Sequence, residues 1–307
     1  MMGMVGSGRY APSPSGDLHV GNLRTALIAW ACARSKDLGF VMRMEDLDER
    51  VRPQYVQSQL ADLKALGIDW DGEVLFQSER LPAYEEVVTQ LQERGLLYEC
   101  YCTRADIREA PTAPHAPPGS YPGTCRDLTE KERDEGRKKL EIMSRGPALR
   151  LRTNNDTLTF TDRVCGEFTG HIDDFVIRRG DGVMAYNLVA VVDDEYQHVH
   201  QVVRADDLLD STPRQIYLQQ LLGFATPEYY HVPLVVNEQG QRLAKRDGAV
   251  TLAQLAEQGM GTEKVFAMIA TSLGSKAETA TEFLESFDPS TLRRGPWTFT
   301  APETSQN

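Results

Sequence analysis

The clearest chemical signal in the sequence is a fourteen-residue stretch, residues 9–22, which reads RYAPSPSGDLHVGN. It connects an expected strand at 5–11 to an expected helix. In open α/β sheets, a strand end followed by a helix start binds phosphate-bearing ligands. Gly16 and Gly21 would let a ligand approach the backbone closely, and His19 at the helix start can donate a hydrogen bond to an anion. Taken alone, H-x-G-N is more simply a capped helix start with an exposed histidine.

The complete stretch resembles the first signature of class I aminoacyl-tRNA synthetases, in the form R-F-A-P-S-P-T-G-x-L-H-x-G of the glutamyl enzymes. The departures are mild, with Tyr10 in place of Phe and Ser15 in place of Thr. The resemblance implies that His19 stabilises the α-phosphate of ATP while it is attacked. It further implies ATP contacts from Pro12, His19, Gly21 and Asn22.

A second basic segment, residues 241–247, follows an expected strand at 231–236 and reads QRLAKRD. Taken alone, it is a solvated turn. After the first signature, it corresponds to the K-M-S-K-S loop of the same family. Lys245 matches the second lysine, whose ammonium neutralises charge on the triphosphate, and is with His19 a candidate catalytic residue. Arg242 replaces the first lysine, whereas Ala244 replaces a serine and loses its hydroxyl. The resemblance implies ATP contacts from Arg242, Leu243 and Lys245.

A third group of residues matches the glutamate-binding positions of the family: Arg9, Ser13, Glu45, Tyr186 and Arg204. Glutamate offers two carboxylates and one ammonium. Two arginines can meet the carboxylates with forked hydrogen bonds, Glu45 can pair with the ammonium, and Tyr186 offers a hydroxyl. Simpler interpretations exist: Glu45 as part of an acidic strand end, and Arg204 in a surface ion pair with Asp206 or Asp207. Ala205 stands where the family has glycine.

The reaction that the resemblance implies needs no nucleophile from the protein. The carboxylate of the amino acid attacks the α-phosphorus of ATP in line, which gives an aminoacyl-adenylate and pyrophosphate. Catalysis then rests on positioning and on cations that offset the developing charge, with Mg²⁺ accompanying ATP. The sequence accordingly contains no grouping of the Ser-His-Asp or Cys-His type that we can identify.

Three of the five cysteines cluster around a proline-rich segment: Cys100, Cys102 and Cys125. A loop with little core of its own and three thiols in a reducing compartment suggests a structural zinc ion. On chemistry, His115 is the commoner type of fourth ligand and Tyr121 is unusual, but the C-x-C…Y-x-x-x-C pattern of the related enzymes favours Tyr121. Three reduced cysteines without a metal are the alternative.

Hydrophobic spacing predicts the elements that would hold these residues. Expected strands lie at 5–11, 40–44, 148–152, 157–161, 175–178, 188–192, 199–204 and 231–236, and expected helices at 20–35, 53–66, 80–94, 129–143, 212–222 and 251–273. The alternation of strand and helix predicts an α/β protein with a parallel sheet. We expect a Rossmann-type catalytic domain split between 1–99 and 186–236, an insertion with the zinc site at 100–185, and the second signature with a short helical region at 237–307.

Length and charge narrow the choice of partner. The chain has 307 residues and a formal net charge of −12, which argues against a protein that coats nucleic acid through bulk charge. Locally, residues 130–152 hold eight basic and five acidic side chains, which could meet a tRNA stem-loop. Only 61 residues follow Arg246, too few for an anticodon-binding domain. This tail and the cysteine insertion resemble the glutamyl-queuosine tRNA(Asp) synthetases, paralogues of glutamyl-tRNA synthetase.

That resemblance implies ATP-dependent activation of L-glutamate without tRNA, followed by transfer of the glutamyl group to queuosine at the wobble position of tRNA(Asp). The alternatives are a truncated glutamyl-tRNA synthetase that charges a tRNA 3′ end, a non-catalytic sensor derived from a synthetase, and a nucleotidylyltransferase. The sequence has no signal peptide or membrane-spanning stretch. We therefore expect a cytoplasmic monomer.

Overall fold

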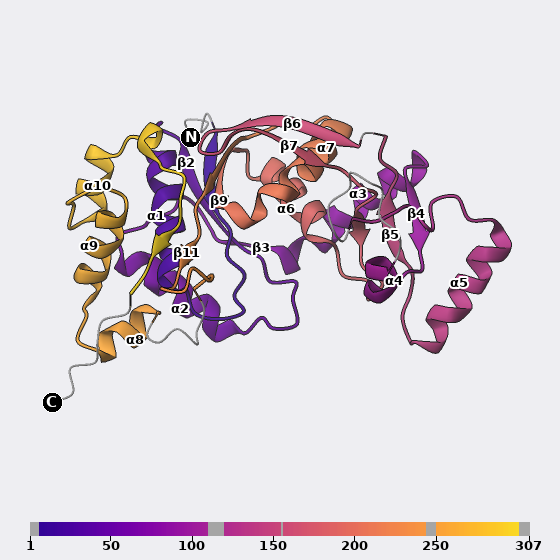
Figure 1. Cartoon of the computed structure of the whole chain (residues 1–307), viewed down its shortest axis with the longest axis horizontal. Coiled ribbons are helices and arrows are strands. Elements are labelled where there is room, and N and C mark those ends of the chain that lie inside the picture. The colour runs from indigo at the N-terminus through magenta and orange to yellow at the C-terminus, as the bar shows by residue number, and fades with distance from the viewer. Residues whose placement is uncertain (1–5, 110–119, 155, 244–249, 301–307) are drawn as a thin grey trace.

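Five parallel strands form the sheet on which the molecule is built, in the order β10-β9-β1-β2-β3 (Figure 1). The computed structural model describes residues 6–109, 120–154, 156–243 and 250–300. The strands of this sheet are β1 (Ser7–Tyr10), β2 (Gly39–Met44), β3 (Leu75–Phe76), β9 (Val199–Ala205) and β10 (Glu228–Val232). The first two and β9 match the expected parallel strands to within three residues at each end, which confirms the α/β class.

Helices cover the sheet and bury their apolar sides against it. The helix α1 (Val20–Arg34) is buried along most of its length and packs on β1, β2 and β9. The other helices of this part are α2 (Pro53–Ala65), α3 (Leu81–Glu93), α6 (Tyr186–Tyr196) and α7 (Thr212–Leu222). All of them were expected except α6, whose residues 188–192 we expected as a strand; that expectation is wrong. A short run of buried apolar residues does not by itself distinguish a strand from a buried helix.

The insertion projects away from the sheet to the right of Figure 1. Its core is an antiparallel sheet in the order β4-β5-β8, formed by β4 (Leu97–Cys100), β5 (Ala148–Leu151) and β8 (Val176–Arg178), with α4 (Arg104–Glu109) and α5 (Glu130–Ile142) beside it. The expected boundary at residue 100 lies at the end of β4, so that this strand belongs with the insertion. The hairpin of β6 (Thr157–Asp162) and β7 (Gly166–His171) instead packs on β10 and α7.

The C-terminal region returns to the sheet-bearing part. It contains α8 (Leu252–Glu257), α9 (Thr262–Ser272), α10 (Ala280–Ser286) and the strand β12 (Trp297–Thr298), which pairs in parallel with β11 (Val235–Val236). The expected helix at 251–273 is therefore two helices separated by a turn. Beyond it, α10 contacts α1, and its Phe283 lies in the same hydrophobic core as the residues of α1. The C-terminal region thus packs on the helix that carries His19 at its start.

Most of the basic residues between 130 and 152 are committed to contacts within the insertion. Arg137 lies within 3.3 Å of Glu99, Glu130 and Asp134, and Lys139 within 2.9 Å of Asp106. These pairs leave less free positive charge on α5 than the residue count predicts. Within the parts of the chain that the structure describes, no helix has the length and apolar character needed to cross a bilayer.

Candidate active site and metal centre

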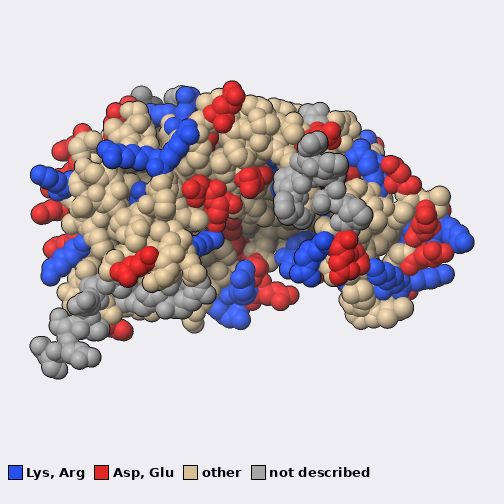
Figure 2. Space-filling model, in the orientation of Figure 1, with Lys and Arg blue, Asp and Glu red and all other residues tan. Residues whose placement is uncertain are grey.

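A cleft of about 590 Å³ opens at the carboxyl ends of β1, β2 and β9. Figure 2 shows the surface hollowed between the sheet-bearing part and the insertion. In a parallel sheet, the carboxyl ends of neighbouring strands meet at one edge, where ligands bind. The cleft brings together nine of the residues predicted from the sequence: Arg9, Pro12, Ser13, His19, Asn22, Glu45, Tyr186, Arg204 and Arg242.

His19 is the N-cap of α1 and forms a reciprocal cap with Asn22. Its Nδ1 accepts a hydrogen bond from the backbone N–H of Asn22 at 3.2 Å, and its own N–H donates to Oδ1 of Asn22 at 3.2 Å. Burial, followed by the charge of Arg242, lowers the pKa of His19 to about 4. The ring is therefore neutral near pH 7, and because Nδ1 is an acceptor, the proton lies on Nε2. This N–H can donate to an anion at the helix start.

Two of the predicted ATP residues do not line the cleft. Gly21 lies in the first turn of α1, where a Cβ atom would come within 2.9 Å of the His19 ring and 3.2 Å of the Val235 side chain. Leu243 is buried, and its N–H donates to the carbonyl of Val235. Gly21 therefore makes room for the His19 ring rather than for a ligand approaching from the cleft. Ala244 and Lys245 lie outside the described residues.

Arg9, at the end of β1, shares one buried carboxylate with Arg43. Nε of Arg9 lies 3.2 Å from Oδ1 of Asp194, and NH1 of Arg43 lies 2.8 Å from the same atom. Arg43 is fully buried and also approaches Oε1 of Glu45 at 3.5 Å. Burial raises the pKa of Glu45 against the opposing charges of Arg43 and Arg9. A ligand ammonium beside Glu45 would offset this burial.

Arg204, at the end of β9, is only 4% exposed but meets neutral partners. Its Nε donates to Nε2 of His231 at 3.1 Å, and NH2 donates to Oγ1 of Thr212 at 2.8 Å. NH1 donates to Oε1 of Gln215 at 2.9 Å and to the Tyr186 hydroxyl at 3.1 Å. No described carboxylate lies within 4 Å of this guanidinium. A buried cation without a counter-ion at a cleft wall is suited to a ligand carboxylate.

The partners of Asp206 and Asp207 test the simpler interpretation of Arg204 as part of a surface ion pair. Asp207 pairs with Arg242, whose NH1 lies 2.6 Å from Oδ2 of Asp207, and Asp206 accepts from the N–H of Leu234. Neither carboxylate pairs with Arg204, so the surface ion pair is ruled out here. Arg242 is held at the rim of the cleft by Asp207, and its charge also acts on His19.

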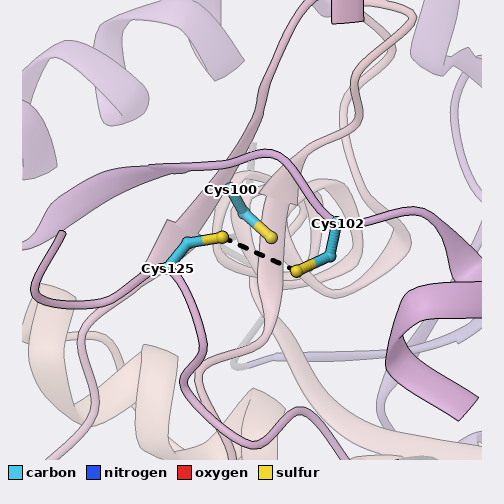
Figure 3. A group of neighbouring side chains, drawn as sticks. All are labelled: Cys100, Cys102 and Cys125. Carbon is cyan, nitrogen blue, oxygen red and sulfur yellow. Dashed lines mark hydrogen bonds between the residues drawn. The ribbon is translucent and has the colours of Figure 1, made fainter. Parts of the chain in front are cut away.

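The three clustered cysteines point their sulfur atoms toward one another (Figure 3). Their Sγ atoms all lie within 4.8 Å of one another, with 3.6 Å between Cys102 and Cys125. All three cysteines are free of disulfides. A tetrahedral zinc ion with bonds of about 2.3 Å to sulfur places its sulfur ligands about 3.8 Å apart. The donor set and its spacing fit a metal ion of this kind.

The fourth position next to the cysteines is occupied by Tyr121. Its hydroxyl oxygen lies 3.5 Å from Sγ of Cys100 and accepts a hydrogen bond from the N–H of Cys125 at 2.7 Å. The guanidinium of Arg150 lies 3.6 Å from the centre of the Tyr121 ring. Tyr121 is thus placed as the resemblance implies, whereas His115 lies outside the described residues.

Three residues that support the cleft were not predicted as site residues from the sequence. Asp194 holds Arg9, His231 accepts from Arg204, and Asp162 accepts from Nδ1 of His231 at 2.7 Å. Burial lowers the pKa of His231, which Asp162 offsets only in part, so that the ring is neutral and can accept from Arg204. The pair Asp193-Asp194 inside an apolar run was a visible signal, because carboxylates are rarely buried without partners.

Comparison with known proteins matches residues 7–295 to the family described as tRNA synthetases class I (E and Q), catalytic domain. The chain is 57% identical over 295 residues to glutamyl-Q tRNA(Asp) synthetase of Nocardia farcinica, covering 96% of this chain and 93% of that protein. It is 48% identical to the protein of the same name from Cutibacterium acnes, over 87% and 76% of the two chains. A glutamate tRNA ligase from Elizabethkingia meningosepticum, in complex with its amino acid, has a TM-score of 0.80 at 25% identity, over 96% and 67% of the two chains.

Proposed function

The chain belongs to the class I tRNA synthetases for glutamate and glutamine, among the glutamyl-Q tRNA(Asp) synthetases, and from this membership we propose its reaction. It activates L-glutamate with ATP and transfers the glutamyl group to queuosine at the wobble position of tRNA(Asp). The observation that carries the proposal is the uncompensated guanidinium of Arg204 in a cleft that also contains Glu45 and His19. The groups suited to a carboxylate, to an ammonium and to the α-phosphate of ATP then line one cleft.

Recognition of glutamate follows from the charges that line the cleft. Arg204 receives the side-chain carboxylate with its charge, and Tyr186 adds a hydroxyl at the same end. Glu45 receives the ammonium, and Ser13 and Arg9 complete the set at the end of β1. An uncharged glutamine side chain would leave a buried cation unpaired, which costs more than a lost neutral hydrogen bond. The site therefore selects glutamate over glutamine.

In the activation step, the α-carboxylate of glutamate attacks the α-phosphorus of ATP. A carboxylate oxygen bonds to phosphorus, the bond to the bridging oxygen breaks, and pyrophosphate leaves with the electron pair. Nε2–H of His19 donates to an α-phosphate oxygen at the start of α1, while Arg242 and Lys245 meet the leaving phosphates. Mg²⁺ that arrives with ATP supplies further neutralisation of charge. In the transfer step, a hydroxyl oxygen of queuosine bonds to the acyl carbon, the bond from that carbon to the phosphate oxygen breaks, and AMP leaves with the electron pair while the hydroxyl proton passes to the phosphate or to solvent.

We propose that Cys100, Cys102, Tyr121 and Cys125 hold one structural Zn²⁺ that fixes the insertion. The spacing of the three sulfur atoms and the position of the Tyr121 hydroxyl support this donor set. Free thiols at this distance suit a reducing compartment, and we propose a cytoplasmic location with tRNA(Asp) as the macromolecular partner. The expectation of a monomer stays a prediction.

The zinc proposal predicts about one metal ion per chain, measured by elemental analysis of protein purified without added metal. Cys100→Ser should abolish binding and destabilise the insertion, because the ion replaces core contacts that this segment lacks. Cys165→Ser is the matched control, since this cysteine lies outside the cluster. A well-folded, metal-free wild-type protein would refute the site.

The activation step is tested by exchange of labelled pyrophosphate into ATP. Purified protein with glutamate, ATP and Mg²⁺ should exchange without any RNA, and glutamine should not replace glutamate. Exchange that appears only after tRNA is added would instead support a truncated glutamyl-tRNA synthetase. Binding of glutamate without exchange would support a non-catalytic sensor.

A further inference from the structure

A second cleft, of about 970 Å³, lies away from the one that holds His19 and Glu45. It is formed where the ends of α9 and α10 meet β12, and α1 contributes Arg24 to its wall. Its volume falls in the range of small-molecule sites. Neither signature of the sequence and none of the predicted site residues line it, so that it is a different place from the cleft that we assign to glutamate activation.

Positive charge dominates the lining of this second cleft. Four cations line it, Arg24, Lys276, Arg293 and Arg294, against the two carboxylates of Glu282 and Asp288. The carboxylates are engaged by backbone N–H groups, that of Glu278 for Glu282 and that of Ser290 for Asp288. Among the described residues, no carboxylate lies within 4 Å of any of the four cations. Figure 2 shows Lys and Arg side chains gathered over the C-terminal segment that Figure 1 colours yellow. In a chain with a net charge of −12, this local surplus is distinctive.

Arg24 is the decisive residue, because it is only 6% exposed. Its Nε donates to Oγ of Ser272 at 3.1 Å and its NH1 to the carbonyl of Pro233 at 3.3 Å, both neutral acceptors. Burial lowers the pKa of Arg24 to about 10, which still leaves the side chain charged at neutral pH. A buried charge without a counter-ion is costly unless a ligand supplies one.

The other buried arginines show how this protein treats such charges. Arg9 and Arg43 share Asp194, whereas Arg150 donates to the carbonyl of Asp174, stacks on the ring of Tyr121 and acts on the Cys100 thiol of the proposed metal site. Within the described part of the chain, Arg204 has neutral partners alone, and it lines the cleft that we assign to glutamate. Arg24 repeats the arrangement of Arg204 at a different cleft, which points to a second anionic ligand.

We propose that the second cleft binds a small molecule that carries phosphate groups. Phosphate fits the four cations because each of its oxygens accepts strong hydrogen bonds from guanidinium and ammonium groups. Half-buried Phe287 and Trp297 in the wall provide a surface for the rest of the molecule. A small ligand is favoured over the backbone of a folded RNA, because Arg24 lines the cleft but is only 6% exposed.

The ligand would act on the catalytic cleft through contacts already present. Arg24 lies on the same helix as the His19 cap, and its NH1 bonds to Pro233, which precedes β11. The chain continues from β11 to Arg242 at the rim of the catalytic cleft. Phosphate at Arg24 would thereby bear on both signatures.

The test is a calorimetric titration of the full chain with inorganic tripolyphosphate in magnesium-free buffer. Wild type should show two binding events, one in each cleft. Lys276→Gln with Arg293→Gln should weaken one event about five- to tenfold and leave the other, because each exposed cation contributes up to about 1 kcal/mol. Neither of these side chains makes a described hydrogen bond or ion pair, so the double variant should fold as the wild type does.

The matched control removes the same charge elsewhere. Lys131→Gln with Lys138→Gln on α5 should keep both binding events, since these exposed lysines make no described hydrogen bond or ion pair and lie outside both clefts. Arg24→Gln should weaken the same event as the first double variant, by on the order of a hundredfold. Urea unfolding shows whether Arg24→Gln folds. If it does not fold, the double variant Lys276→Gln with Arg293→Gln provides the test by itself.

Three outcomes would overturn the proposal. The first is a single binding event in the wild type, and the second is equal tripolyphosphate affinity in the two double variants. The third is a variant at 276 and 293 that binds tripolyphosphate normally but tRNA weakly, which would assign the cleft to RNA. Pyrophosphate exchange with glutamate is measured beside these titrations and should be retained by both double variants. If the wild type shows no exchange, the proposed function is contradicted. The tripolyphosphate titrations then still test the second cleft, because they measure binding and not activity.

Discussion

The carboxyl ends of β1 and β9 each place a buried arginine at the catalytic cleft, but the two ends are built on opposite electrostatic plans. At β1, Arg9 shares the carboxylate of Asp194 with Arg43, and Glu45 stands beside them. At β9, Arg204 is surrounded by neutral hydrogen-bond acceptors, chief among them His231. As far as the described residues go, one end is balanced in charge before any ligand binds, whereas the other carries an unmatched positive charge.

This difference separates two tasks that a list of binding residues does not distinguish. A balanced cluster can hold the shape of the site before a ligand binds, and Glu45 at its edge can face a ligand ammonium. An unmatched cation gains most from a ligand carboxylate, and binding of that group is what brings the charge to neutrality. The β1 end is therefore expected to matter first for stability, and the β9 end for glutamate affinity.

The largest effect is expected from Asp194→Asn. This change leaves the buried charges of Arg9 and Arg43 without their shared carboxylate, and the free energy of unfolding should fall by about 3 kcal/mol. Urea unfolding measures the loss. Asp207→Asn is the control, since its pair with exposed Arg242 should contribute less than about 1 kcal/mol. Equal losses in the two variants would contradict the balanced-cluster account.

Arg204→Gln should act on binding rather than on folding. We expect kcat/KM for glutamate in pyrophosphate exchange to fall about a hundredfold, because a charge-assisted bond to a carboxylate contributes roughly 1.5–3 kcal/mol. The KM for ATP should change little. Arg108→Gln, an exposed arginine of α4, is the control. A loss of less than about threefold would show that the unmatched charge does not serve glutamate.

The smallest effect is a pH dependence at His231. The folded-state pKa of this ring lies below its ordinary value, so that as pH falls below about 6.5 the unfolded chain takes up a proton that the folded chain does not. Stability attributable to His231 is present above that pH and decreases below it. The variant His231→Gln keeps an amide oxygen that can accept from Arg204 but has no group that titrates there. Between pH 7 and pH 5.5, the free energy of unfolding should fall by about 1 kcal/mol more in the wild type than in this variant. Parallel pH profiles would contradict the neutral-acceptor role.

Much of the fold was accessible from the sequence because its strands and helices carry regular apolar spacing. The sheet strands β1, β2 and β9 and the helices α1 and α2 lie close to their expected positions. Residues 188–192 were expected as a strand but belong to α6, because a helix buried on most sides lacks the polar face that gives helical periodicity. The two-residue strands β3 and β12 escaped because such short segments carry no pattern of their own.

The candidate site was predicted better in its ligand-facing residues than in the residues behind them. The first signature located Arg9 and His19, and the match to the glutamate-binding positions of the family located Arg204. Asp162 and His231 are 69 positions apart and meet only because the β6–β7 hairpin packs on β10. The sequence carries no local record of that packing. The second cleft escaped for the same reason, because α1 meets α9 and α10 across most of the length of the chain.

The central claim is that a glutamate-activating cleft serves a modified base instead of a tRNA 3′ end. It is tested most directly by incubating the protein with labelled glutamate, ATP and Mg²⁺ and either tRNA(Asp) that contains queuosine or the same tRNA without this modification. Label should appear in the first tRNA alone, and nuclease digestion of that labelled tRNA should place the label in the anticodon fragment rather than at the 3′ end. Equal labelling of both tRNAs, or label confined to the 3′ end, would contradict the account.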